Sequence, residues 1–132
     1  MIVTKQMVDE LVELIKIAHE KIIKESGGEQ GVRDEGGLTH AAFEILSSIE
    51  KHPDKFFYNA TVIYRMLATR HYFIDGNKRT SHVTAQTWLL SHGYDFKVDY
   101  EQAVPFIISI AQGKSLKEIE EWIKENVVKS SA

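Results

Sequence analysis

The chain has 132 residues and a mass of 15.1 kDa, the size of one domain around one hydrophobic core, so residues 1–132 are expected to form a single domain. Hydrophobic residues make up 43% and charged residues 27%, as in ordinary soluble globular proteins, and a net charge of -3 offers no general basic surface for direct nucleic-acid binding. The lack of cysteine excludes disulfides and thiolate metal sites, and without a leader-like segment or a long apolar run we expect a cytoplasmic protein with no membrane contact.

Apolar residues recur at helical spacing in the first part of the chain. The spacing predicts a first helix over residues 4–26, which Gly27 ends, and a second over residues 38–50. Pro53 separates the second helix from the next, because the residue before a proline is pushed out of the helical region. His19 lies off the main apolar stripe of the first helix, so we expect it to be solvated or satisfied by a neighbour.

Residues 26–37, SGGEQGVRDEGG, form the one long irregular stretch, with five glycines and charges of both signs. A linker is the simplest interpretation. A loop of this length inside a compact domain is more often functional than idle, so the stretch is a candidate part of a site.

Helical spacing returns in two further segments, a third helix over about residues 55–70 and a fourth over residues 77–92 that ends at Gly93. The fourth is expected to be the central and most buried helix. Residues 94–98 read as a short extended piece.

Two helices are predicted at the C-terminal end. Asp99 can cap the fifth helix, which Pro105 should either kink or truly start. Ser115 opens a capping box for the sixth helix, which is expected to continue through Val127, and residues 129–132 should fray.

The connection between the third and fourth helices, residues 71–80, reads HYFIDGNKRT and concentrates reactive groups. Gly76, Asn77 and Lys78 are expected at the N-terminus of the fourth helix, where free N–H groups and the helix dipole favour an anion. Gly76 lets a ligand approach the backbone closely, and Lys78 and Arg79 add positive charge. Two cations in a first helical turn oppose the dipole unless an anion is bound, so a phosphate is the expected ligand.

Two more side chains of this stretch complete a set for phosphoryl transfer. Asp75 could reach a phosphate only through a cation, and Mg²⁺ suits one carboxylate together with phosphate oxygens and water. His71 is a candidate general base, since an imidazole has an unperturbed pKa of about 6.5. Each residue type also occurs in ordinary turns and caps, so the combination carries the prediction.

The stretch resembles the Fic/Doc signature, in which histidine, phenylalanine, an acid, a small residue, asparagine, glycine or lysine, and arginine follow in order. Asn77-Lys78-Arg79 is similar to the Doc (death-on-curing) branch, whereas the adenylylating Fic branch has glycine at the lysine position. The glycines and Arg33-Asp34 upstream and the helical tail extend the resemblance over nearly the whole chain. It implies an all-α fold, a compact bundle of about six helices with the motif loop leading into a central helix.

The resemblance also implies roles for individual residues. His71 would deprotonate a target hydroxyl, Asp75 would hold Mg²⁺, and Phe73 would anchor the loop in the core. The side chains of Lys78 and Arg79 would stabilise charge on the transferred group. The residues that would bind the phosphates of ATP are Gly76, Asn77, Lys78 and Arg79.

The function implied is that of a toxin in a toxin–antitoxin pair. In the Doc branch the γ-phosphate of ATP is transferred to a threonine of elongation factor Tu, which arrests translation. Transfer of AMP by the same site is the chemical alternative, and a catalytically silent module that binds an antitoxin as a co-repressor is the non-enzymatic one. A zinc enzyme and a P-loop fit poorly, because the chain lacks H-x-x-x-H spacing, cysteine ligands and the P-loop glycines.

The sequence departs from the Fic pattern at two places, and the resemblance also implies one binding surface. His82 stands where the Fic signature has a second arginine; it could still bind phosphate, or it could be a helix-face histidine with a neighbouring partner. The self-inhibitory Fic motif is absent because residue 121 is glutamate, so an inhibitor would come from another chain, a Phd-like antitoxin. Residues 26–37 correspond to a flap that pairs with a target segment as an added strand, with Val32 and Arg33 as contacts.

Overall fold

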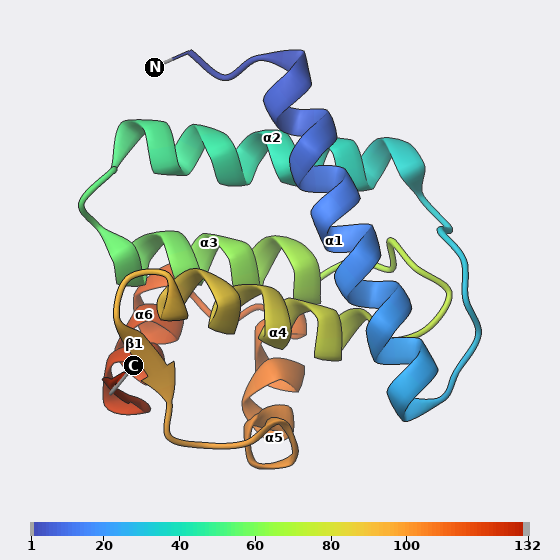
Figure 1. Cartoon of the computed structure of the whole chain (residues 1–132). Coiled ribbons are helices and arrows are strands. Elements are labelled where there is room, and N and C mark those ends of the chain that lie inside the picture. The colour runs from blue at the N-terminus through green and yellow to red at the C-terminus, as the bar shows by residue number, and fades with distance from the viewer. Residues whose placement is uncertain (1, 131–132) are drawn as a thin grey trace.

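The computed structural model describes residues 2–130, in which six helices and one two-stranded sheet follow each other along the chain (Figure 1). The prediction of a bundle of about six helices is confirmed, and the small sheet is an addition to it. In chain order the elements are α1 (Lys5–Ser26), α2 (Glu35–Lys51), α3 (Phe56–Ala68), α4 (Asn77–Leu90), β1 (Tyr94–Phe96), α5 (Tyr100–Ala111), α6 (Leu116–Glu125) and β2 (Val127–Lys129).

Helices α3 and α4 run antiparallel side by side, and the HYFIDGNKRT stretch covers the loop between them and the first turn of α4 (Figure 1). Helix α3 contacts α2, α4, α5 and α6, while α4 contacts α1, α3, α5 and β1. More of α3 than of α4 is buried, because the apolar residues of α3 face neighbours on several sides, so the prediction that the fourth helix is the most buried is wrong. The loop is therefore held between two helices that the core fixes in place.

Two helices begin at positions set by aspartate caps. Helix α2 starts three residues earlier than the predicted position 38, because an Asp34 carboxylate oxygen accepts a hydrogen bond from the Gly37 N–H at 2.8 Å. Helix α5 starts at Tyr100 with a capping box between Asp99 and Gln102. Pro105 lies inside α5, so the reading in which Pro105 starts the helix is wrong.

The C-terminal segment forms a strand where helix and fraying were predicted. Helix α6 ends at Glu125, and Asn126 donates a side-chain hydrogen bond to the Trp122 carbonyl at 2.8 Å. The two valines that follow, Val127 and Val128, favour a strand. This strand, β2, pairs with β1 in an antiparallel register, with Tyr94 opposite Lys129. Fraying is thus wrong for Lys129, and residues 131–132 lie outside the described residues.

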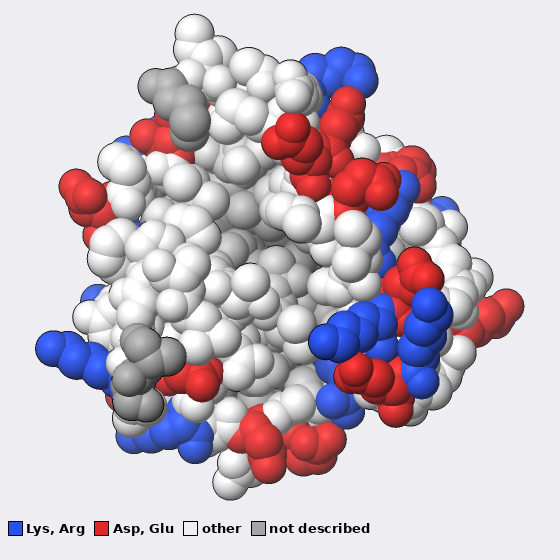
Figure 2. Space-filling view, viewed as in Figure 1, with Lys and Arg blue, Asp and Glu red and all other residues white. Residues whose placement is uncertain are grey.

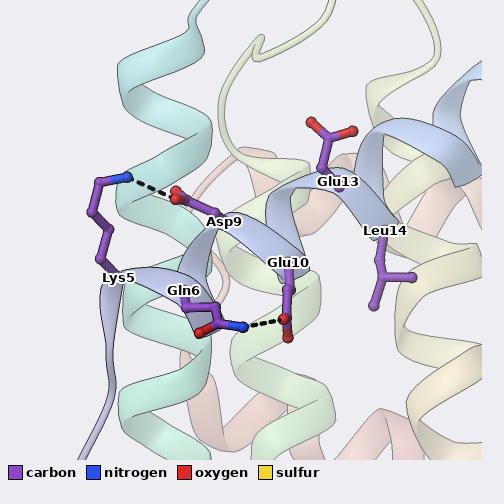
Figure 3. Close-up of a pocket in the computed structure, with 6 residues that line it drawn as sticks. All are labelled: Lys5, Gln6, Asp9, Glu10, Glu13 and Leu14. Atoms are coloured by element: carbon purple, nitrogen blue, oxygen red, sulfur yellow. Dashed lines mark hydrogen bonds and ion pairs between the residues drawn. The ribbon is translucent and has the colours of Figure 1, made fainter.

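The face turned toward the viewer in Figure 2 is uncharged at its centre, where the surface is hollowed. This hollow of about 410 Å³ is lined mostly by apolar side chains of α1, α2 and α4. The outer face of the first half of α1 instead carries pairs four residues apart, Lys5 with Asp9 and Gln6 with Glu10 (Figure 3). Such exposed pairs contribute little to stability. Within residues 2–130 no helix has the length and apolar character needed to cross a membrane.

Candidate active site

The loop between α3 and α4, residues 71–76, is paired along one side with residues 27–34, which we call the flap segment. Val32 forms an isolated antiparallel bridge with Phe73. The Ile74 N–H donates to the Gly31 carbonyl at 3.1 Å, and the Arg33 N–H donates to the Tyr72 carbonyl at 2.7 Å. Segments far apart in sequence therefore lie side by side beside the end of α1 (Figure 1).

The other side of the loop is paired with a side chain. Oδ1 of Asn77 accepts from the Phe73 N–H at 3.0 Å, and Nδ2 of Asn77 donates to the Phe73 carbonyl at 2.9 Å. The amide thus occupies the position that a neighbouring strand would take. Because this side chain is used to hold the loop, only the backbone N–H of Asn77 is left for an anion.

Phe73 is 2% exposed, as expected of a residue that anchors the loop, and its ring stacks on His19 of α1. The two ring centroids are 3.8 Å apart with an interplanar angle of 8°. The second contact of this histidine is a polar one, since its Nε2 lies 2.7 Å from the Asp75 carbonyl oxygen. A carbonyl oxygen can only accept, so Nε2 donates.

Of the two alternatives predicted for His19, a solvated side chain is wrong, because His19 is 3% exposed, and a side chain satisfied by a neighbour is confirmed by its hydrogen bond to the Asp75 carbonyl. Its position off the apolar stripe and its lack of a place in the site were also predicted wrongly. The signal was present in the helical spacing. His19 lies four residues after Ile15 and four before Ile23, both of which are buried, so it shares their face of α1.

Gly76 begins α4 in the left-handed region, with φ of 80°. A Cβ added at this position would lie 2.9 Å from Cδ1 of Ile23 and 3.6 Å from the His19 ring. Both the conformation and the close approach therefore require glycine. No side chain caps α4, and the N–H groups of Asn77, Lys78 and Arg79 have no acceptor within residues 2–130. These groups form the open helix N-terminus that the sequence predicted.

His71 and Asp75 are both exposed at the two ends of the loop. Within the described residues, His71 makes no hydrogen bond, ion pair or ring contact. Oδ2 of Asp75 accepts from the Glu29 N–H of the flap segment at 2.7 Å, and Oδ1 has no partner among residues 2–130. The flap segment therefore fixes the Asp75 carboxylate and leaves one oxygen open.

The Asp75 carboxylate fits the expected Mg²⁺ ion. No group of three or more metal-binding side chains gathers among residues 2–130. Mg²⁺ bound together with a nucleotide needs only one or two carboxylates, since phosphate oxygens and water complete its shell. The open Oδ1 of Asp75, beside three free N–H groups, suits that coordination.

The two cations of the stretch differ in their surroundings. Lys78 is half-buried and forms no ion pair within the described part of the chain. Arg79 is held by the start of α5: its Nη2 lies 3.2 Å from Oε1 of Glu101, and its guanidinium lies 4.1 Å from the centroid of the Tyr100 ring. Lys78 is therefore an unpaired cation at the helix N-terminus, and Arg79 is an oriented one.

Comparison with models of known protein families matches residues 10–89 of this chain to the Fic/DOC family. The match spans more than half of the chain and includes the flap segment and the whole motif loop. The chain belongs to the Fic/DOC family. A comparison with curated proteins gives no match. Fic/DOC proteins are typically transferases, and membership points to ATP as the donor and to a protein substrate or an antitoxin as the partner.

One Fic/DOC signature position is turned into the core of this chain. His82 is 3% exposed, shares a hydrogen bond with the Tyr64 hydroxyl, and stacks on Phe96 with ring centroids 4.8 Å apart. Burial, with the nearby Arg79 charge, lowers the pKa of His82 to about 4, and burial raises the pKa of Tyr64. A neutral, enclosed imidazole has no face toward a phosphate, so we leave His82 out of the proposed phosphate ligands.

The buried His82 should make the stability of this Fic/DOC protein depend on pH. Below its ordinary pKa of about 6.5 the unfolded chain binds a proton, whereas the folded protein does not until the pH approaches 4. The free energy of unfolding should therefore fall as the pH drops from 6.5 to 4, by about 3 kcal/mol for this group. Urea unfolding of wild type and of His82→Gln across this range measures the effect. Parallel pH profiles of the two proteins would contradict it.

Proposed function

We propose that this chain is a Doc-type phosphotransferase toxin that transfers the γ-phosphate of ATP to a threonine of a target protein such as elongation factor Tu. The observation that carries the proposal is the combination at the start of α4: Lys78, unpaired, stands beside three open N–H groups in a position where the adenylylating branch has glycine. The exposed His71 lies at the other end of the same rigidly paired loop.

The roles of the residues follow from their chemistry. His71 accepts the proton of the threonine hydroxyl as the hydroxyl oxygen forms a bond to the γ-phosphorus. The bond from that phosphorus to the β–γ bridging oxygen breaks, and ADP leaves with the electron pair. The backbone of Gly76, Asn77 and Lys78, with the open N–H groups that extend to Arg79, and the side chains of Lys78 and Arg79 stabilise the charge on the transferred group.

Asp75 is the residue that would hold Mg²⁺, through the carboxylate oxygen that the flap segment leaves open. When bound, the ion neutralises phosphate charge and orients the phosphates. The Glu29 N–H keeps the carboxylate in one orientation through the other oxygen, so the position of the ligand is set before nucleotide binds.

The flap segment supports a protein substrate. Gly31 and Arg33 lie on either side of Val32. The Gly31 carbonyl and the Arg33 N–H both point toward the motif loop and bond to it. In an extended strand the groups between them point the other way, and the Val32 N–H and carbonyl have no partner within residues 2–130. A target strand could add at this outer edge, with the exposed Arg33 beside it. We also propose that residues 1–132 act as one cytoplasmic Fic/Doc domain restrained by a Phd-like antitoxin.

The experiment that tests the proposal uses the purified protein, Mg²⁺, extract of the host cells, and ATP labelled at either the α or the γ phosphate. Label from γ alone on a protein of the size of an elongation factor is the expected result, with His71→Ala as the blank. Label from α would establish AMP transfer instead. No label from either position, with a folded sample, would favour the silent antitoxin-binding module.

A further inference from the structure

His19 lies against the motif loop but has no part in the proposed chemistry. It comes from α1, outside the signature, and is buried with two contacts to the loop: the ring stack on Phe73 and the Nε2–H donated to the Asp75 carbonyl. It is also within 3.6 Å of the position that a Cβ of residue 76 would take. One side chain thus contacts the loop at Phe73 and Asp75 and lies close to Gly76.

The hydrogen bond to the Asp75 carbonyl orients more of the loop than one atom. That oxygen belongs to the peptide unit between Asp75 and Gly76, and a peptide unit is planar, so holding its oxygen fixes the orientation of the whole unit. One end of the unit carries the Asp75 side chain. The other leads through the left-handed Gly76 into the free N–H groups of α4. A single donor therefore orients both the carboxylate and the anion-binding helix start relative to each other.

We propose that His19 is a positioning residue of the transferase site, which holds the Asp75–Gly76 peptide unit so that the carboxylate and the N-terminus of α4 face one nucleotide. This rests on the proposed function, since the nucleotide is the one assigned there. The Phe73 ring beneath the imidazole fixes the plane of the donor, and burial shields the hydrogen bond from water.

A purely structural role for His19 makes the opposite prediction. The neighbours of His19 on the same face of α1 include Ile15 and Ile23, which are buried apolar residues. If the side chain only fills space, an apolar residue of similar volume should serve at least as well, because a buried polar group costs stability unless it is hydrogen-bonded. The two roles can therefore be separated by two nearly isosteric variants.

His19→Gln and His19→Met form that pair, since the two new side chains match in length and differ in the amide donor. His92→Met is the control for loss of a stacked histidine. His92 packs on Phe56 and Trp88 and bonds to the Trp88 carbonyl, but it follows the opposite end of α4 from the loop. All three variants are compared with wild type for thermal midpoint, for binding of Mg·ATP by calorimetry, and for kcat and KM of label transfer.

We expect His19→Gln to be more active than His19→Met although it is no more stable. His19→Met should raise the Kd and KM for Mg·ATP about tenfold and lower kcat, while its thermal midpoint equals or exceeds that of His19→Gln. His19→Gln should stay within about threefold of wild type, and His92→Met should bind as wild type does. Equal Kd and kcat for the glutamine and methionine variants would overturn the proposal.

Amide hydrogen exchange without nucleotide separates a failure of this proposal from a failure of the proposed function. Within residues 2–130 the Phe73 N–H donates to Oδ1 of Asn77 and the Ile74 N–H donates to the Gly31 carbonyl. Both should exchange about tenfold faster in His19→Met than in His19→Gln, while the Leu89 amide in α4 stays unchanged. If wild type binds no Mg·ATP, the proposed function fails, and the exchange rates alone decide the role of His19. Equal loop exchange in both variants refutes it.

Discussion

Replacement of His71 by alanine should lower the rate of label transfer by at least about 100-fold, the usual contribution of a general base, and leave the thermal midpoint unchanged. Stability should not change because the side chain is exposed and, within residues 2–130, makes no hydrogen bond, ion pair or ring contact. Transfer rate and circular dichroism melting of the same preparation measure the two effects.

A surface histidine supplies the control for this variant. His40 lies on the exposed side of α2, where its Nε2 is 3.7 Å from Oε1 of Glu44, so His40→Ala should keep both the rate and the midpoint of wild type. Retention of the wild-type rate by His71→Ala would mean that another group takes the proton, and the assignment of the base would be wrong.

Phe73→Ala should destabilise the protein by about 3–5 kcal/mol, since truncation of a fully buried phenylalanine leaves a cavity as well as losing apolar contact. The change also removes the surface on which the His19 ring stacks. Transfer should therefore be lost even at temperatures where the helices remain folded. Urea denaturation followed by circular dichroism gives the free energy of unfolding.

The matched control for this prediction is Phe43→Ala. Phe43 is 45% exposed on α2, so the same truncation there should cost less than about 1 kcal/mol and leave transfer intact. A Phe73→Ala protein as stable as Phe43→Ala would show that the loop has no anchor in the core.

The apolar residues at helical spacing were sufficient to predict the six helices, because each helix buries its apolar face against the core. Helix α1 ends at Ser26 as predicted, and Gly27 follows it with φ of 86°. The helix ends were predicted wrongly where a single side chain sets the position at which a helix starts or stops. The Asp34 cap extends α2 back through two glycines that read as loop, and the Asn126 side chain precedes a strand that read as helix.

The candidate site was predictable to the extent that it is contiguous. The open helix start and the left-handed Gly76 follow from residues that are neighbours in sequence. The groups that hold these residues are not neighbours: the Glu29 N–H on Asp75 and the Glu101 carboxylate on Arg79 come from other segments. No local pattern encodes such contacts, so a single sequence identifies the reacting groups but not the residues that orient them.

The contacts around Asp75 also separate function from folding. His19 and Asp75 are 56 positions apart, and Glu29 and Asp75 are 46 apart, so both contacts close long loops. The packing of α3 on α4 closes a much shorter one. A partly open molecule in which α1 and the flap segment have come away would keep its helical hairpin and lose the geometry at Asp75. A protein in this partly open state would keep much of its helical structure but could not transfer a phosphoryl group, because the contacts that orient Asp75 come from α1 and the flap segment.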